Sequence, residues 1–82
     1  MNIYVGNLSY EVEEYDLKGI FEEYGKVNSV RVIMDKFTGR SKGFAFVEME
    51  NKEEAEKAIN GLNGGSLVER KLVVNEARER SN

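Results

Sequence analysis

The segment 42–49 shows the alternation of a β-strand, and the two faces that it defines carry very different side chains. Successive side chains along a strand point to opposite faces. The odd positions form an apolar set that suits a core: Ala45, Val47 and Met49. The even positions place two phenylalanines between two charged residues: Lys42, Phe44, Phe46 and Glu48. Because lysine and glutamate are rarely buried without a partner, this second face is expected to be in solvent, where folding alone requires no phenylalanine.

Hydrophobic periodicity predicts three further strands and two helices. Strands are expected over 3–5, 27–34 and 71–75, where apolar residues alternate with other side chains. Helices are expected over 13–24 and 52–62, where apolar residues recur at the spacing of one helical face. Two right-handed crossovers in this order place both helices on the same side of a sheet. The predicted fold is therefore α+β, a βαββαβ ferredoxin-like sandwich with a four-stranded antiparallel sheet and two helices on one face.

Strand parity divides the four strands in a consistent way. The side chains expected to face the helices are all apolar: Ile3, Val5, Val30, Val32, Ala45, Val47, Leu72 and Val74. The opposite face is expected to hold aromatic, polar and basic side chains: Asn2, Tyr4, Ser29, Arg31, Ile33, Lys42, Phe44, Phe46, Lys71, Val73 and Asn75. An antiparallel sheet can leave one face to solvent. Tyr4 thus joins the two phenylalanines from a separate strand, and exposed rings beside a lysine suit stacking on unpaired nucleic-acid bases.

The composition restricts the other function classes. The 82 residues suit one small domain, and they include no cysteine and no histidine, so disulfides and thiolate or imidazole metal sites are excluded. We expect no cofactor, no small-molecule substrate and no enzymatic activity, because no nucleophile–base pair or phosphate-binding glycine loop is present. No apolar run approaches the roughly 18 residues of a membrane span, and no signal peptide precedes the first strand. A cytoplasmic protein without a membrane partner is therefore expected.

The net charge of −3 argues at first against a nucleic-acid partner, since such proteins usually carry basic patches. The charges are unevenly distributed, however. Residues 1–25 carry six acidic residues against one lysine, whereas residues 26–50 carry five basic residues against three acidic ones. Local charge dominates within a Debye length of about 8 Å. The segment that contains the two phenylalanines is thus the basic part of the chain.

Two sequence motifs give the chain a resemblance to the RNA recognition motif (RRM) domain over essentially its whole length. The longer motif of that family is Lys/Arg-Gly-Phe/Tyr-Gly/Ala-Phe-Val-x-Phe/Tyr. Residues 42–47 match six of its seven specified positions, and Met49 is the exception. The shorter motif, aliphatic–aromatic–aliphatic–x–Asn–Leu, resembles residues 3–8. The stretches 4–10 and 38–44 are similar to small bacterial single-RRM proteins and to glycine-rich RNA-binding proteins.

The resemblance implies a domain that binds single-stranded RNA, or single-stranded DNA, on its open sheet face. We expect a monomer with the RRM domain over 1–78 and a frayed tail over 79–82. The expected contacts combine ring stacking, phosphate contacts and polar contacts to bases: Asn2, Tyr4, Arg31, Lys42, Phe44, Phe46, Lys71, Asn75 and Arg78. Asn7 is expected to serve the turn after the first strand. For Phe37, at the tip of the loop before residue 42, an extra stacking role and mere tolerance both stay open.

The alternative is an RRM-like module that binds protein through its acidic first helix. Some such domains grip a tryptophan-bearing peptide with that helix and an Arg-x-Phe loop. The acidic helix is present here, but residues 70–72 read Arg-Lys-Leu in place of Arg-x-Phe.

Glu13 stands where relatives often have a Thr or Ser cap, so the first helix is expected to fray. Acylphosphatases share the same general plan of sheet and helices, but the carboxylates of this chain are expected on a helix face and not together in a pocket.

Overall fold

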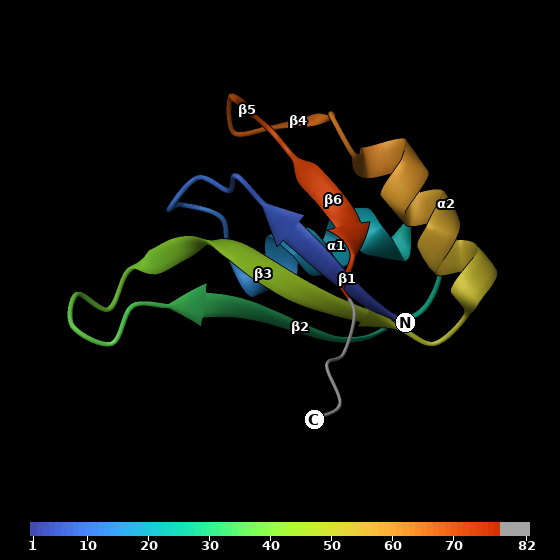
Figure 1. Cartoon of the computed structure of the whole chain (residues 1–82), viewed down its shortest axis with the longest axis horizontal. Coiled ribbons are helices and arrows are strands. Elements are labelled where there is room, and N and C mark those ends of the chain that lie inside the picture. Colours follow the sequence, from blue (N-terminus) through green and yellow to red (C-terminus); the bar gives the residue numbers. More distant parts are fainter. Residues whose placement is uncertain (78–82) are drawn as a thin grey trace.

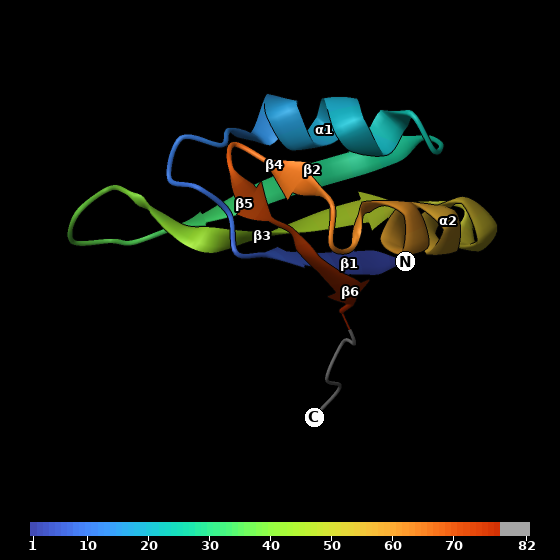
Figure 2. The ribbon, with the colours of Figure 1, turned by 90° about the horizontal axis from the view of Figure 1, so that it is seen from above.

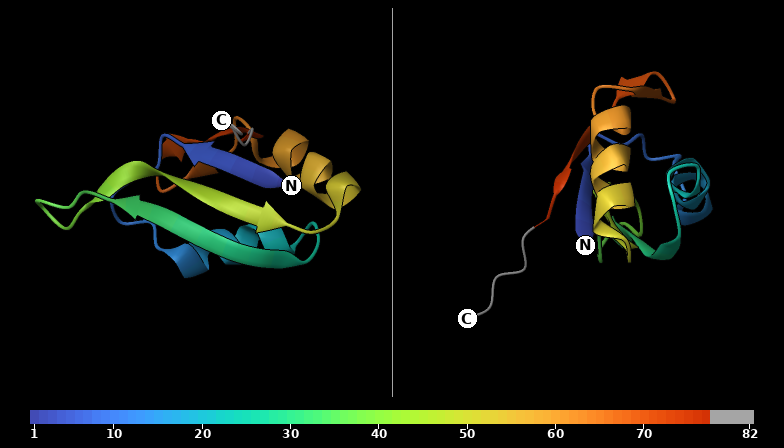
Figure 3. Two further views of the ribbon diagram at one scale, coloured as in Figure 1. Left: turned by 60° about the horizontal axis from the view of Figure 1, so that its bottom comes forward. Right: turned by 90° about the vertical axis from the view of Figure 1, so that its right-hand side faces the viewer.

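The computed structural model of the chain describes residues 1–77. Within them, two helices and six strands follow in this order: β1 (Asn2–Gly6), α1 (Glu14–Glu22), β2 (Val27–Met34), β3 (Ser41–Met49), α2 (Lys52–Leu62), β4 (Ser66–Leu67), β5 (Arg70–Lys71) and β6 (Val73–Glu76). Figure 1 labels these elements, and Figure 3 (right) shows both helices on the same side of the sheet. The predicted boundary at Arg78 and the tail 79–82 lie outside the described residues.

The main sheet has the strand order β2-β3-β1-β6, and every pairing in it is antiparallel. The two helices cover one of its faces: Figure 2 shows α1 over the sheet, and the right-hand view of Figure 3 shows α2 on the same side. The predicted ferredoxin-like βαββαβ fold is thus confirmed. Strands β4 and β5 form a separate two-stranded hairpin between α2 and β6. Neither helix in residues 1–77 has both the length and the apolar character that crossing a membrane requires.

The predicted last strand, 71–75, is divided in two. The amide of Leu72 donates to the carbonyl of Gly65 at 2.7 Å, and its carbonyl accepts from the amide of Gly64 at 2.8 Å. Leu72 therefore pairs with the turn after α2, and only β6 continues along β1. Sequence alternation could not reveal this interruption, because it leaves the apolar pattern of Leu72 and Val74 unchanged.

The core lies between the sheet and the helices and follows the predicted parity. Seven of the eight side chains expected to face the helices are buried, and Val30 is half-buried. The helices contribute Leu17 and Phe21 from α1 and Ala55 and Ala58 from α2. Met49 is fully buried, so the one departure from the longer motif replaces one large apolar core residue with another.

Strand β2 departs from simple alternation at both ends. The register with β3 shifts between Val27 and Ser29 and again between Val32 and Met34. The sequence pattern places Met34 on the same face as Val32, and both side chains line one groove at the start of α1, although 51% of Met34 is exposed at the end of the strand. The second shift faces Gly43 on β3, whose φ of +87° favours glycine. Such bulges are typical of sheet edges, where β2 lies, and they cannot be predicted from a period-two pattern.

The start of α1 has a cap that the sequence prediction missed. The Glu13 backbone amide donates to Oδ2 of Asp16 at 2.9 Å, which is half of a capping box. An acidic side chain in the first turn also interacts favourably with the helix dipole. Asp16 therefore provides the stabilisation that the absence of Thr or Ser at position 13 had put in doubt.

Each outer strand of the sheet has one backbone amide covered by a side chain. The Val32 amide of β2 donates to Oε2 of Glu14 at 3.0 Å. The Val74 amide of β6 donates to Oδ1 of Asn63 at 3.0 Å. Unpaired amides on an edge strand invite pairing with another chain. Helix α1, which begins at Glu14, and the residue that follows α2 thus protect the two edges of the sheet.

Substitution of Glu14 tests this protection. We expect Glu14→Ala to lower the free energy of unfolding by about 1 kcal/mol more than Glu14→Gln does, because the glutamine oxygen can still accept from the Val32 amide. Both variants lose the same charge, so the difference between them isolates the hydrogen bond. Urea unfolding followed by circular dichroism measures it. Equal destabilisation by the two substitutions would contradict the assigned role.

Candidate nucleic-acid interface

Three rings meet on the open face of the sheet and form what we call the aromatic triad: Tyr4, Phe44 and Phe46. Tyr4 stands on β1, and the two phenylalanines stand on β3. The ring centroids are 5.9 Å apart for Tyr4 and Phe44 and 6.0 Å apart for the other two pairs. The rings are inclined to one another by 30°, 64° and 85°, arrangements that aromatic pairs favour over a face-to-face sandwich. The predicted meeting of the three rings is confirmed.

The triad combines mutual support with exposure. Phe46 is 38% exposed, whereas Tyr4 and Phe44 are half-buried. Each ring touches the other two, so its position is constrained before any ligand arrives. Neither of the two helices within residues 1–77 covers this face, because both lie on the other side of the sheet. The rings therefore offer a rigid apolar surface that is open to a flat partner such as a base.

Two rings of the triad, Tyr4 and Phe46, belong to a row of side chains that crosses all four strands. Arg31 on β2 lies opposite Phe46, Phe46 lies opposite Tyr4, and Tyr4 lies opposite Asn75 on β6. Directly opposed residues of antiparallel strands have Cβ atoms about 4.5–5.5 Å apart. The row thus brings four predicted site residues together, with a guanidinium at one end, an amide at the other and two rings between them.

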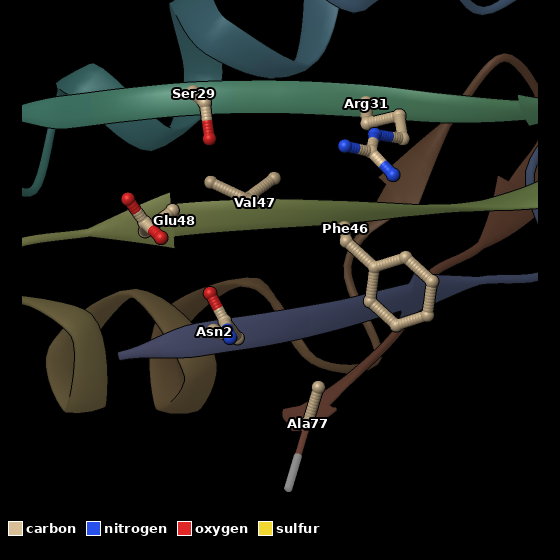
Figure 4. A pocket seen from close by; sticks show the side chains of 7 residues that line it. All are labelled: Asn2, Ser29, Arg31, Phe46, Val47, Glu48 and Ala77. Carbon is tan, nitrogen blue, oxygen red and sulfur yellow. The ribbon is translucent and has the colours of Figure 1, made fainter. Parts of the chain in front are cut away.

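A pocket of about 410 Å³, which we call the Phe46 pocket, lies beside this row; its lining residues are Asn2, Ser29, Arg31, Phe46, Val47, Glu48 and Ala77. Figure 4 shows Asn2, Ser29 and Glu48 gathered toward one end and Arg31 with Phe46 at the other. The sequence interpretation did not include Glu48 among the candidate site residues and used it only to mark a solvent-exposed face. Its carboxylate accepts hydrogen bonds and repels phosphate, so it suits the N–H groups of a base.

The remaining predicted cations lie apart from the row. Lys42 is exposed at the start of β3, close to the loop that precedes it. Lys71 was expected on the open face of the last strand, but it lies on β5, outside the four-stranded sheet. There its carbonyl accepts from Nδ2 of Asn7 at 2.7 Å, and Asn7 has a φ of +57°. The turn role predicted for Asn7 is confirmed, and Arg78 lies outside the described residues.

Gly6 permits the position of the Tyr4 ring. A Cβ added to Gly6 would come within 2.7 Å of Cε2 of Tyr4, a separation too short for two carbon atoms. The ring of Tyr4 thus lies over the backbone of Gly6, two residues along the same face of β1. Sequence reasoning treated this position only as the end of the strand. The structure shows instead that the missing side chain lets the ring lie in this position.

The loop between β2 and β3 is held by its own hydrogen bonds. Oδ1 of Asp35 accepts from the backbone amides of Thr38 at 3.1 Å and Phe37 at 2.8 Å. These two bonds, with a smaller contribution from the Lys42 ammonium, hold the pKa of the Asp35 carboxyl below its ordinary value. Phe37 itself is 98% exposed, so it has no packing role in the fold. A stacking role for Phe37 stays a prediction.

The chemistry that this surface offers is non-covalent. Within residues 1–77, no group of three or more carboxylates is placed to hold a metal ion. The open face presents rings for stacking, cations for phosphate and a few polar groups for base edges. This combination is typical of surfaces that bind single-stranded nucleic acid.

Comparison with known proteins places the chain in a family. The family model described as RNA recognition motif matches residues 3–73. "Putative RNA-binding protein RbpA" of Synechocystis is 50% identical over 82 residues, which are 100% of this chain and 81% of that protein. The crystal structure of RNA binding protein PG1 has a TM-score of 0.94 and 55% identity, covering 100% of this chain and 99% of that one. The Rna15 RRM with bound RNA (GU) has a TM-score of 0.85 and 31% identity, covering 95% of this chain and 83% of that one. The chain belongs to the RNA recognition motif family.

Proposed function

We propose that this protein binds short single-stranded RNA on the open face of its sheet. Bases stack on the aromatic triad, and neighbouring cations contact the phosphates. The observation that carries the proposal is the meeting of three partly exposed rings, 5.9–6.0 Å apart, on the face away from the helices. Membership of the RRM family supports it, as do a relative named for RNA binding and a similar domain with bound RNA.

The expected affinity is moderate. Each stacked base contributes about 1–3 kcal/mol, and ordering and association costs offset part of that sum. A Kd on the order of micromolar follows. Duplexes should bind poorly because their bases are already stacked, and only contacts to the 2′-hydroxyl distinguish RNA from DNA. Single-stranded DNA therefore stays a second ligand to test.

Base preference arises beside the triad. A base on Phe46 has its edge toward the Phe46 pocket, where Asn2 and Ser29 offer both donors and acceptors. Glu48 offers acceptors only, so it favours bases with exposed N–H groups. Asn75, at the opposite end of the row, provides a further amide. With so few polar groups, we expect a modest preference among bases.

A protein-binding role for the acidic helix α1 is the alternative. We expect RNA to change the NMR signals of β1 and β3, and changes confined to α1 would favour the alternative.

We propose a monomer without catalytic activity, and the cytoplasmic location stays a prediction.

Removal of two rings tests the stacking mechanism. Phe44→Ala combined with Phe46→Ala should weaken RNA binding by at least about 30-fold, since two stacked bases lose their platform. The fold should survive, because both side chains lie outside the core. Tyr15→Ala is the matched control: this tyrosine is 74% exposed on helix α1, away from the open face. Fluorescence anisotropy measures affinity and circular dichroism the fold; unchanged affinity in a folded double variant would refute the mechanism.

Substitution of Gly6 tests the positioning of Tyr4. Gly6→Ala should displace the Tyr4 ring and reduce RNA affinity by about 5-fold, through the partial loss of one stacked base. Gly19→Ala makes the same chemical change on α1, where an added Cβ meets nothing within 4 Å. That control should leave affinity unchanged and stabilise the helix by about 1 kcal/mol. If both alanine variants bind RNA like the wild type, Gly6 has no positioning role.

Salt dependence tests the phosphate contacts. If Lys42 with Arg31, Arg40 or Lys71 neutralises two or three phosphates, log K should fall with log salt at a slope of about −1.4 to −2. Lys42→Gln should reduce the steepness by about 0.7. Lys57→Gln, on the exposed side of α2, removes an equal charge and should not change the slope. Equal effects of the two substitutions would indicate a general charge effect in place of a local contact.

A further inference from the structure

A second pocket adjoins the aromatic triad on the side away from the Phe46 pocket. It has a volume of about 500 Å³, within the usual range for ligand sites of about 300–1,000 Å³. Phe44 of the triad forms one of its walls, and Tyr10, from the segment between β1 and α1, forms another. Arg40 and Lys42 also line it. We call it the Tyr10–Phe44 pocket; it combines two rings with two cations, the groups that bind a nucleotide.

Tyr10 is exposed although the chain around it is anchored. Leu8 and Val12, on either side of it, are 2% and 4% exposed. The Leu8 amide donates to the Gly43 carbonyl at 2.8 Å, which fixes this segment to the start of β3. Tyr10 itself is 67% exposed. The fold therefore holds the backbone at this point and leaves the ring available.

The opposite wall is fixed in a similar way. The Asp35 amide donates to the Arg40 carbonyl at 2.7 Å, and the Arg40 amide donates to Oγ1 of Thr38 at 3.2 Å. Thr38 is in turn held by the Asp35 carboxylate. The loop thus holds the backbone of Arg40 beside the pocket without a ligand. Pre-ordered groups reduce the conformational entropy lost on binding.

Charge distinguishes the Tyr10–Phe44 pocket from the groove on the other side of Tyr10. That groove, of about 770 Å³, runs along the start of α1 and is lined by Glu11, Glu13 and Glu14. Phosphate is repelled there by three carboxylates. In the Tyr10–Phe44 pocket the cations of Arg40 and Lys42 outnumber Asp35, whose carboxylate is already bonded to backbone amides. An RNA chain that continues beyond Phe44 is therefore directed between Tyr10 and the loop that joins β2 to β3.

We propose that the Tyr10–Phe44 pocket is a further nucleotide subsite of the RNA-binding surface. Tyr10 stacks on the base that follows the one on Phe44, and Arg40 with Lys42 contacts the intervening phosphate. This inference rests on the proposed function, since it extends the same strand by one nucleotide. It also predicts which oligomers will reveal the subsite: those long enough to pass beyond the triad.

The test compares affinity across oligomer length. Random-sequence RNA from about two to about eight nucleotides, a range around known site sizes, is titrated into the full chain. Tyr10→Ala should match the wild type with the shortest oligomers that bind and fall about 5- to 100-fold behind with the longest. Tyr10→Phe keeps the ring and should bind like the wild type. Tyr15→Ala removes a similarly exposed tyrosine from α1 and should have no effect at any length.

A second variant provides an independent reading. Arg40→Gln should reduce the steepness of the salt dependence by about 0.7 more with long oligomers than with short ones. NMR signals of the Thr38 and Arg40 amides should shift only when the longer oligomers are added. These measurements also hold if Tyr10→Ala proves too unstable to study.

The outcomes separate the subsite from the proposed function. If the wild type binds no oligomer, the proposed function itself fails. If it binds and Tyr10→Ala matches it at every length, with the Thr38 and Arg40 signals unmoved, the subsite is refuted and the proposed function stands. An equal loss at every length also refutes the subsite, because Tyr10 would then act through the triad.

Discussion

The burial of one face of the sheet against two helices fixes what the other face presents. Apolar side chains must face the helices, and the period of a strand is two, so the same register decides which residues meet solvent. A slip of one residue between β1 and β3 would expose Val47 and turn Phe46 into the core. Such a slip loses the burial of several apolar side chains, each worth about 1.5–3 kcal/mol. The core packing of one face therefore maintains the aromatic triad on the other.

Glycine then adjusts the details that the register leaves open. Gly6 gives the Tyr4 ring room to lie along β1, and Gly43, with its φ of +87°, lets β3 turn out of register just before Phe44. The Gly43 carbonyl also accepts from Leu8, so the same residue joins the start of β3 to the segment that carries Tyr10. These two glycines thus couple the shape of the backbone to the placement of the rings of Tyr4, Phe44 and Tyr10.

The sequence predicted those features that depend on periodicity and missed those that depend on particular hydrogen bonds. The fold, the buried set and the meeting of Tyr4 with Phe44 and Phe46 all follow from alternation. The displacement of Lys71 from the main sheet could not be predicted, because it results from bonds between Leu72 and the turn after α2. Likewise, the Asp16 cap and the role of Gly6 depend on where one side chain lies relative to a backbone. The Tyr10–Phe44 pocket needed the loops on both of its sides to be placed, and loops carry no periodic signal.

The distribution of charge explains how an acidic domain can present a surface for RNA. The sequence pI is about 5.0, so long-range attraction to a polyanion is weak or absent. Arg31, Arg40 and Lys42 lie on or beside the open face, whereas α1 carries Glu14, Asp16 and Glu22 on the other side of the sheet. The carboxylates on α1 repel RNA from the helix side of the sheet. Because the Debye length is only about 8 Å, they do not cancel the attraction of the cations near the rings. In the proposed binding mode, charge orients the RNA, and stacking, which salt screens little, contributes about 1–3 kcal/mol per base.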